Sequence, residues 1–144
     1  MDRLVRNLGI AACFLFLASL ALPAAEVTIF DSPALVLGWE AAVSSVGMAT
    51  APMSDPGILV LALAAVSNIV FVIAPWMVLK SRKRPISSVY AVAVAIAFLL
   101  AAISPFALSN FPLLHGGYFV WIMAYLLLFS AATMQAAGRS NASA

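Results

Sequence analysis

The sequence predicts an all-α fold: an integral membrane four-helix bundle with a short interfacial outer helix. Of its 144 residues, 65% are hydrophobic and only 8% are charged, whereas soluble domains are about 25% charged. Four long apolar runs divide the chain, and all of its basic residues fall on one side of these runs. A soluble fold of this size could not hide so much apolar surface from water, so lipid is the expected solvent.

The apolar runs have the length of membrane spans. The run from Ile58 to Leu79 carries no charge, and as a helix it extends about 33 Å, enough for a hydrocarbon core of about 30 Å. Because lipid offers the backbone no hydrogen-bond partner, helices are expected. A single membrane domain over residues 1–144 therefore has predicted helices at about 5–25, 57–80, 86–105 and 115–137.

The first apolar run, Leu8 to Ala25, follows Arg3 and Arg6, so a cleaved signal peptide is the alternative interpretation. The region where cleavage would occur has Pro23 near the cut and no A-x-A triplet. A retained helix is therefore expected. Cleavage would leave the orientation of the other helices unchanged.

The charges predict the orientation of the helices. The segment 26–56, between the first two helices, carries four carboxylates and no basic residue. The positive-inside rule assigns loops rich in lysine and arginine to the cytoplasm. It predicts a multi-pass protein of the plasma membrane with a cytoplasmic N-terminus and a cytoplasmic C-terminus. The basic residues on that side are Arg3, Arg6, Lys80, Arg82, Lys83, Arg84 and Arg139.

The outer loop 26–56 is the only long connection. Residues 27–30 have the β-branched and aromatic composition of a short extended stretch. Ser32 and Pro33 then suit the N-cap and the first position of a helix. We expect a helix over about 33–48, too short to span the membrane, lying at the outer interface or in the mouth of the bundle.

Five residues are candidates for an outer-face binding site. Aromatic side chains at this depth commonly anchor a protein at the membrane interface. The sharper alternative is a shallow outer pocket in which Glu40 and His115 are the polar groups and pair with each other. Tyr118 and Trp121 would lie about one helical turn apart. The five candidates are Trp39, Glu40, His115, Tyr118 and Trp121.

Asn68 is the candidate for a polar contact in the membrane interior, because it lies in the middle of the second predicted helix. A buried amide needs hydrogen-bond partners. A structural hydrogen bond to a neighbouring helix is the simpler interpretation, worth about 1 kcal/mol. Asn68 lining a polar cavity or contacting a ligand is the alternative.

Three stretches together resemble a family of small bacterial four-helix integral membrane proteins of unknown function. They are Gly38-Trp39-Glu40-Ala41, Asn68, and Gly117-Tyr118-Phe119-Val120-Trp121, against a family pattern of GWEA, AN and GYYLW. Ser67 stands here where alanine is common, and Phe119 replaces a tyrosine. The resemblance implies the same four-helix layout and a bacterial inner membrane location, and it brings no activity.

The sequence favours a non-enzymatic function. It has one histidine, no cysteine pair and no glycine-rich phosphate loop, and the predicted spans contain no carboxylate. We expect no catalytic, cofactor-binding or metal site, and no nucleic-acid partner. A partner-binding or accessory subunit of the inner membrane is the leading hypothesis. A small oligomeric transporter or channel for a neutral or lipidic solute is the alternative. Ala93, Ala97 and Ala101 form a small-residue row that could pack within the bundle or in a homo-oligomer.

Overall fold

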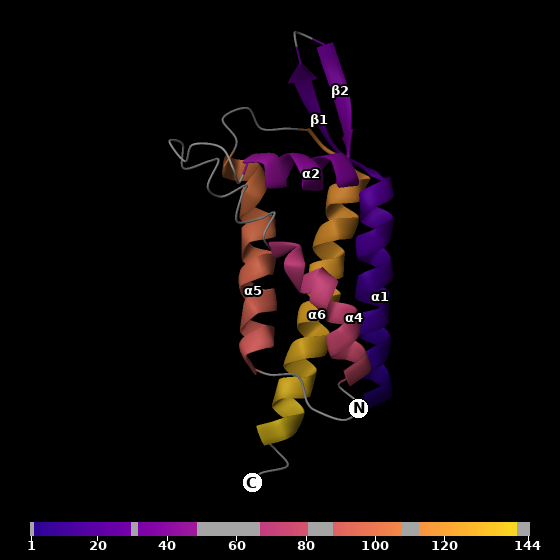
Figure 1. Ribbon diagram of the computed structural model, residues 1–144, viewed down its shortest axis with the longest axis vertical. Coiled ribbons are helices and arrows are strands. Elements are labelled where there is room, and N and C mark those ends of the chain that lie inside the picture. Colours follow the sequence, from indigo (N-terminus) through magenta and orange to yellow (C-terminus); the bar gives the residue numbers. More distant parts are fainter. Residues whose placement is uncertain (1, 30–31, 49–66, 81–87, 108–112, 141–144) are drawn as a thin grey trace.

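The computed structural model describes residues 2–29, 32–48, 67–80, 88–107 and 113–140, which are mostly helical (Figure 1). The first part of the second predicted span and the basic loop 81–87 lie outside the described residues. In chain order the elements are α1 (Asp2–Ala21), β1 (Pro23–Ile29), β2 (Ser32–Leu37), α2 (Gly38–Met48), α4 (Ile69–Lys80), α5 (Ser88–Ile103), the 3-10 helix η1 (Ser104–Ala107), β3 (Leu113–Leu114) and α6 (Gly116–Ser140).

Within the described residues, three helices are long and apolar enough to cross a membrane: Arg3–Ala21, Val89–Phe106 and Gly116–Ala136. The described part of the second predicted span forms α4, a helix of 12 residues. Large apolar side chains on the outside of these helices are strongly exposed, including Phe14 at 70% and Val72 at 77%. A lipid environment would cover them, as the high mean hydropathy of the chain predicts.

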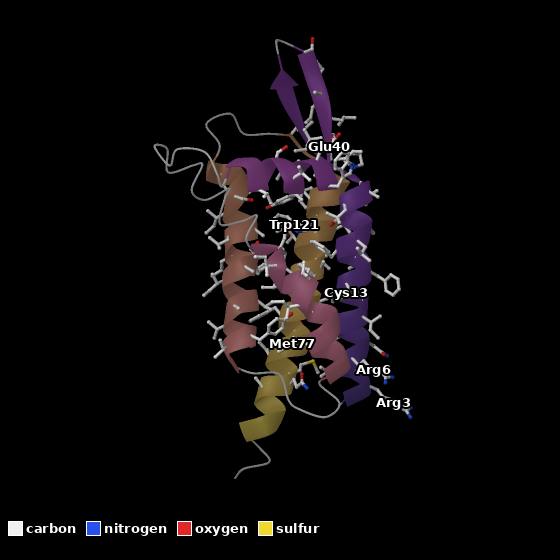
Figure 2. All side chains as sticks on the ribbon, in the orientation of Figure 1. Arg3, Arg6, Cys13, Glu40, Met77 and Trp121 are labelled. Carbon is white, nitrogen blue, oxygen red and sulfur yellow. The ribbon has the colours of Figure 1, made fainter. Side chains whose placement is uncertain are left out.

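The helices α1, α4, α5 and α6 run side by side, and the three strands and α2 gather at one end (Figure 1). We call this the sheet end. The N-terminal end of α1 and the C-terminal turn of α6 both lie at the opposite end. Figure 2 shows Arg3 and Arg6 at that opposite end and Glu40 at the sheet end. Arg3 and Arg6 are thus separated from Glu40 along the bundle.

The core of the bundle forms where α6 packs along α1 and α5. On α1, Val5, Ala12 and Ser19 are buried at intervals of seven residues, which is the spacing of one helix face. On α6, Tyr125 and Leu128 are almost completely inaccessible. Because α1 covers this face of α6, the first helix is an integral part of the fold.

The small-residue row on α5 lies partly inside this core. Ala97 is 2% exposed and Ala101 is fully buried, and both belong to the cluster that packs around Tyr125 and Leu128. Small side chains let helix backbones approach closely. Packing within the bundle therefore accounts for Ala97 and Ala101.

The sheet end differs from the sequence-based expectation. The three strands form an antiparallel sheet in the order β2-β1-β3, and the helix predicted over 33–48 begins only at Gly38. Residues 32–37 instead pair with β1. The Ser32-Pro33 start signal was wrong because pairing with β1 supplies these backbone groups with partners. Glu40 helps to fix the actual start, since its Oε2 accepts a hydrogen bond from the Leu37 backbone N–H at 2.9 Å.

Two glycines join the sheet end to the bundle through close backbone contact. A Cβ atom at Gly38 would clash with the backbone carbonyl of Ser19, and one at Gly117 would lie 2.6 Å from the Pro23 carbonyl oxygen. The Gly38 N–H also donates to the Leu22 carbonyl at 3.0 Å. The helix α1 ends at Ala21, four residues before the predicted end, because the chain turns here into β1.

Candidate functional site

Asn68 lies in the turn immediately before α4 and accepts two hydrogen bonds from α6. Trp121 Nε1 donates to its Oδ1 at 3.0 Å, and the Tyr125 hydroxyl donates to the same atom at 3.2 Å. The indole N–H can only donate, so the carbonyl side of the Asn68 amide must face α6. Both lone pairs of Oδ1 are thereby used.

Ser67 extends this arrangement by one further bond. Its hydroxyl oxygen lies 2.8 Å from the Tyr125 hydroxyl oxygen. Because the single Tyr125 hydrogen is directed at Asn68, Ser67 is the donor in this contact. Tyr125 is fully buried, and Ser67 is only 6% exposed. We call Ser67, Asn68, Trp121 and Tyr125 the Asn68 cluster; it satisfies polar groups in the apolar interior.

Tyr118 also bonds inward, at the point where α5 gives way to η1. Pro105 has no N–H, so the carbonyl four residues earlier, on Ala101, loses its usual helical partner. The Tyr118 hydroxyl donates to this carbonyl at 3.2 Å, and the Ser104 hydroxyl donates at 2.9 Å. Tyr118 therefore ties α6 to the end of α5.

A continuous series of aromatic contacts runs from Tyr118 into the core. The ring centroids of Tyr118 and Trp121 are 5.9 Å apart, and those of Trp121 and Tyr125 are 5.4 Å apart. Phe71 meets Tyr125 edge-on at 4.7 Å and stacks on Phe16 of α1 at 4.3 Å. Such pairs contribute about 0.5–1.5 kcal/mol each beyond the area they bury. The series links α6, α4 and α1.

The polar candidates at the sheet end have separate partners. His115 Nε2 lies 3.6 Å from Glu26 Oε2, an ion-pair contact that is too long for a hydrogen bond. This nitrogen is itself covered, although the side chain is 31% exposed. His115 pairs with Glu26 and not with Glu40, whose carboxylate caps α2. The pairing of Glu40 with His115 that the outer-pocket alternative included is therefore not formed.

The five predicted outer-face residues consequently occupy different environments. Tyr118 and Trp121 point into the bundle, where Figure 2 shows Trp121 below α2. Trp39 is 50% exposed at the start of α2. The Glu40 carboxylate accepts the hydrogen bond from the Leu37 N–H, and His115 lies against Glu26. The structure brings Tyr118 and Trp121 together with Asn68, and leaves Trp39 at the surface.

Exposed apolar side chains extend across the sheet end. On α2, Trp39, Val43 and Val46 recur at the spacing of one helix face and are 50–63% exposed. Leu35 on β2 is 58% exposed, and Leu113 on β3 is 63% exposed. We call these five residues the sheet-end apolar surface. They lie on elements other than the three candidate spans.

Sequence reasoning missed two important residues. Tyr125 could have been noticed because it follows Trp121 by four residues on the same face of α6, but its partners come from a distant part of the chain. In the sequence, Glu26 stood out only as one of the four carboxylates of segment 26–56. Its contact with His115 depends on β3 pairing beside β1, which brings residues 26 and 113 opposite each other.

The described residues contain no group of three or more His, Cys, Asp or Glu side chains that could hold a metal ion. The groups of the Asn68 cluster are neutral and already bonded to one another, which suits them to holding helices together. No known protein family, no curated protein and no solved structure matches the chain.

Proposed function

We propose that this protein is a non-enzymatic, partner-binding subunit of the bacterial inner membrane. The observation that carries the proposal is the sheet-end apolar surface, on which five large apolar side chains are each at least 50% exposed. They lie outside the three candidate spans. Exposed apolar patches of this kind mark interaction sites on proteins.

The proposed topology has four spans with both termini in the cytoplasm. All seven basic residues flank the spans on the side of the termini, and segment 26–56 has none. The extensive packing of α1 on α6 favours retention of the first helix. Under this topology the sheet end lies on the outer side of the membrane, and the partner is a membrane or outer-surface protein.

The contacts of the polar residues support a structural role over catalysis or transport. Glu40 and Asn68 are both engaged within the fold. The Asn68 carbonyl oxygen already accepts two hydrogen bonds from α6, so this oxygen is not available to a solute. The transporter hypothesis therefore has less support than the subunit hypothesis.

The test is isolation of the tagged full-length protein from crosslinked membranes in mild detergent. We expect one partner in a fixed stoichiometric ratio, because exposed apolar side chains outside the candidate spans favour a specific complex. Crosslinking from a photoreactive residue at Val43 should give the same adduct. Recovery of the monomer alone across several detergents would contradict the proposal.

A further inference from the structure

The register of the sheet creates an apolar–acidic–apolar row. Glu26 on β1 lies opposite Leu35 on β2 and opposite Leu113 on β3. Residues directly opposite each other in antiparallel strands project from the same face of a sheet. Neighbouring strands are about 4.8 Å apart, so the three side chains form a row about 10 Å wide.

The row is open to a partner. Leu35 is 58% exposed and Leu113 is 63% exposed. The side chain of Glu26 is 36% exposed, and its Oε2 lies 3.6 Å from His115 Nε2, too far for a hydrogen bond, so the carboxylate can accept a further cationic partner. A carboxylate between two exposed leucines suits a ligand that presents a cationic group between apolar groups.

The charge of the segment between Arg6 and Lys80 indicates which kind of partner the row binds. Four of the five carboxylates of the chain, at positions 26, 31, 40 and 55, fall between Arg6 and Lys80, where no lysine or arginine occurs. A second copy of the chain would bring carboxylates against carboxylates, which is unfavourable. Anionic lipid headgroups would also be repelled, whereas interfacial helices that bind them are rich in Lys and Arg.

We propose that the row Leu35–Glu26–Leu113 binds a protein segment that presents Lys or Arg between apolar side chains. This inference rests on the proposed function and specifies the chemistry of its partner. The apolar side chains of the segment would cover Leu35 and Leu113. Its cationic group would pair with Glu26, which gives the complex its orientation and its selectivity.

The test measures binding of two short labelled peptides to the full-length protein in nanodiscs of neutral phosphatidylcholine. One peptide contains leucine and lysine, and the other has glutamate in place of lysine. Empty nanodiscs correct for binding to lipid. We expect the lysine peptide to bind the loaded discs at least about tenfold more tightly than the glutamate peptide, with an affinity that falls as salt is added.

Matched carboxylate variants locate the contact. Glu26→Gln should weaken binding of the lysine peptide about fivefold, the upper end for a surface ion pair. Glu40→Gln removes a carboxylate at the same end and keeps the capping oxygen, so it should change binding less than twofold. Leu35→Ser with Leu113→Ser should weaken binding about tenfold. Unchanged thermal unfolding of the variants shows that the fold is retained.

Several results would overturn the inference. In the peptide assay, they are equal binding of the two peptides or binding no stronger than to empty discs. Among the variants, it is an equal effect of Glu26→Gln and Glu40→Gln. A dimer crosslinked through residue 113 would show that the row contacts a second copy of the chain instead. The salt titration of the unmodified protein provides a test that needs no variant, and a flat response would also count against the row. If a stoichiometric partner is recovered from membranes while the peptides fail, only the assigned chemistry is wrong and the subunit proposal stands.

Discussion

The bundle interior and the sheet end are held together in different ways. In the interior, polar side chains bond to each other across helices, as Asn68 does with Trp121 and Tyr125. At the sheet end, backbone hydrogen bonds and glycine contacts join the elements, and apolar side chains remain exposed. The comparison shows that the conspicuous motif residues mostly build the structure. We propose that partner binding depends on residues that the fold leaves exposed.

The largest expected effect concerns the junction between the two regions. Gly117→Ala places a methyl group against the carbonyl oxygens of Pro23 and Leu22, which are backbone atoms that cannot rotate away. We expect a loss of about 3 kcal/mol in the free energy of unfolding, at the upper end for overpacking. The measurement is the thermal unfolding midpoint in mild detergent, which should fall by about 6–12 °C.

Gly116→Ala is the matched control for this prediction. A methyl group at Gly116 would meet no other atom within 4 Å, so this variant should unfold within about 2 °C of the original protein. The same contrast is expected between Gly38 and Gly47, because a methyl group at Gly47 also meets nothing within that distance. Equal effects of Gly116→Ala and Gly117→Ala would show that the junction is not closely packed.

The second-largest expected effect tests the interior of the bundle. Asn68→Leu leaves the Trp121 N–H and the Tyr125 hydroxyl without their acceptor in an apolar environment, and each unsatisfied group costs about 1–3 kcal/mol. We expect a total loss of about 2 kcal/mol, because Tyr125 can turn its hydrogen toward Ser67. Unfolding can be followed by tryptophan fluorescence. A stability equal to that of the original protein would mean that the Asn68 cluster contributes nothing to the bundle.

The smallest effect concerns the Ala101 carbonyl, which accepts from both Ser104 and Tyr118. Ser104→Ala and Tyr118→Phe should each cost about 0.5–1 kcal/mol, because the other donor remains. The double variant leaves this carbonyl without a side-chain partner beside Pro105, so it should cost more than the sum. A double-mutant cycle measures the difference. Simple additivity would show that the two hydroxyls do not share this role.

Much of the helical part was predictable because each long apolar run carries its own signal. The apolar runs predicted helices where α5 and α6 lie, and the extended stretch at 27–30 was expected where β1 is found. The sequence also predicted Asn68, Tyr118 and Trp121 as candidate functional residues. Aromatic and amide groups in an apolar run need partners, whatever the fold is.

The rest depended on contacts between distant residues. The Ser32-Pro33 signal describes a local preference, and pairing of residues 32–37 with β1 overrode it. Sequence separation equally hid the contacts of Tyr125 with Ser67 and of Glu26 with His115. The close approach of Gly117 to Pro23 could not be predicted either, because it depends on how α6 meets the end of α1.

The most direct test of the difference between the two regions is partner recovery with the variant Val43→Ser/Val46→Ser. These side chains are 63% and 59% exposed, so their replacement should leave the unfolding midpoint within about 2 °C of the original. We expect crosslinked membranes of this variant to yield the folded protein without its stoichiometric partner. Recovery of that partner at the original ratio would contradict the assignment of binding to the sheet end.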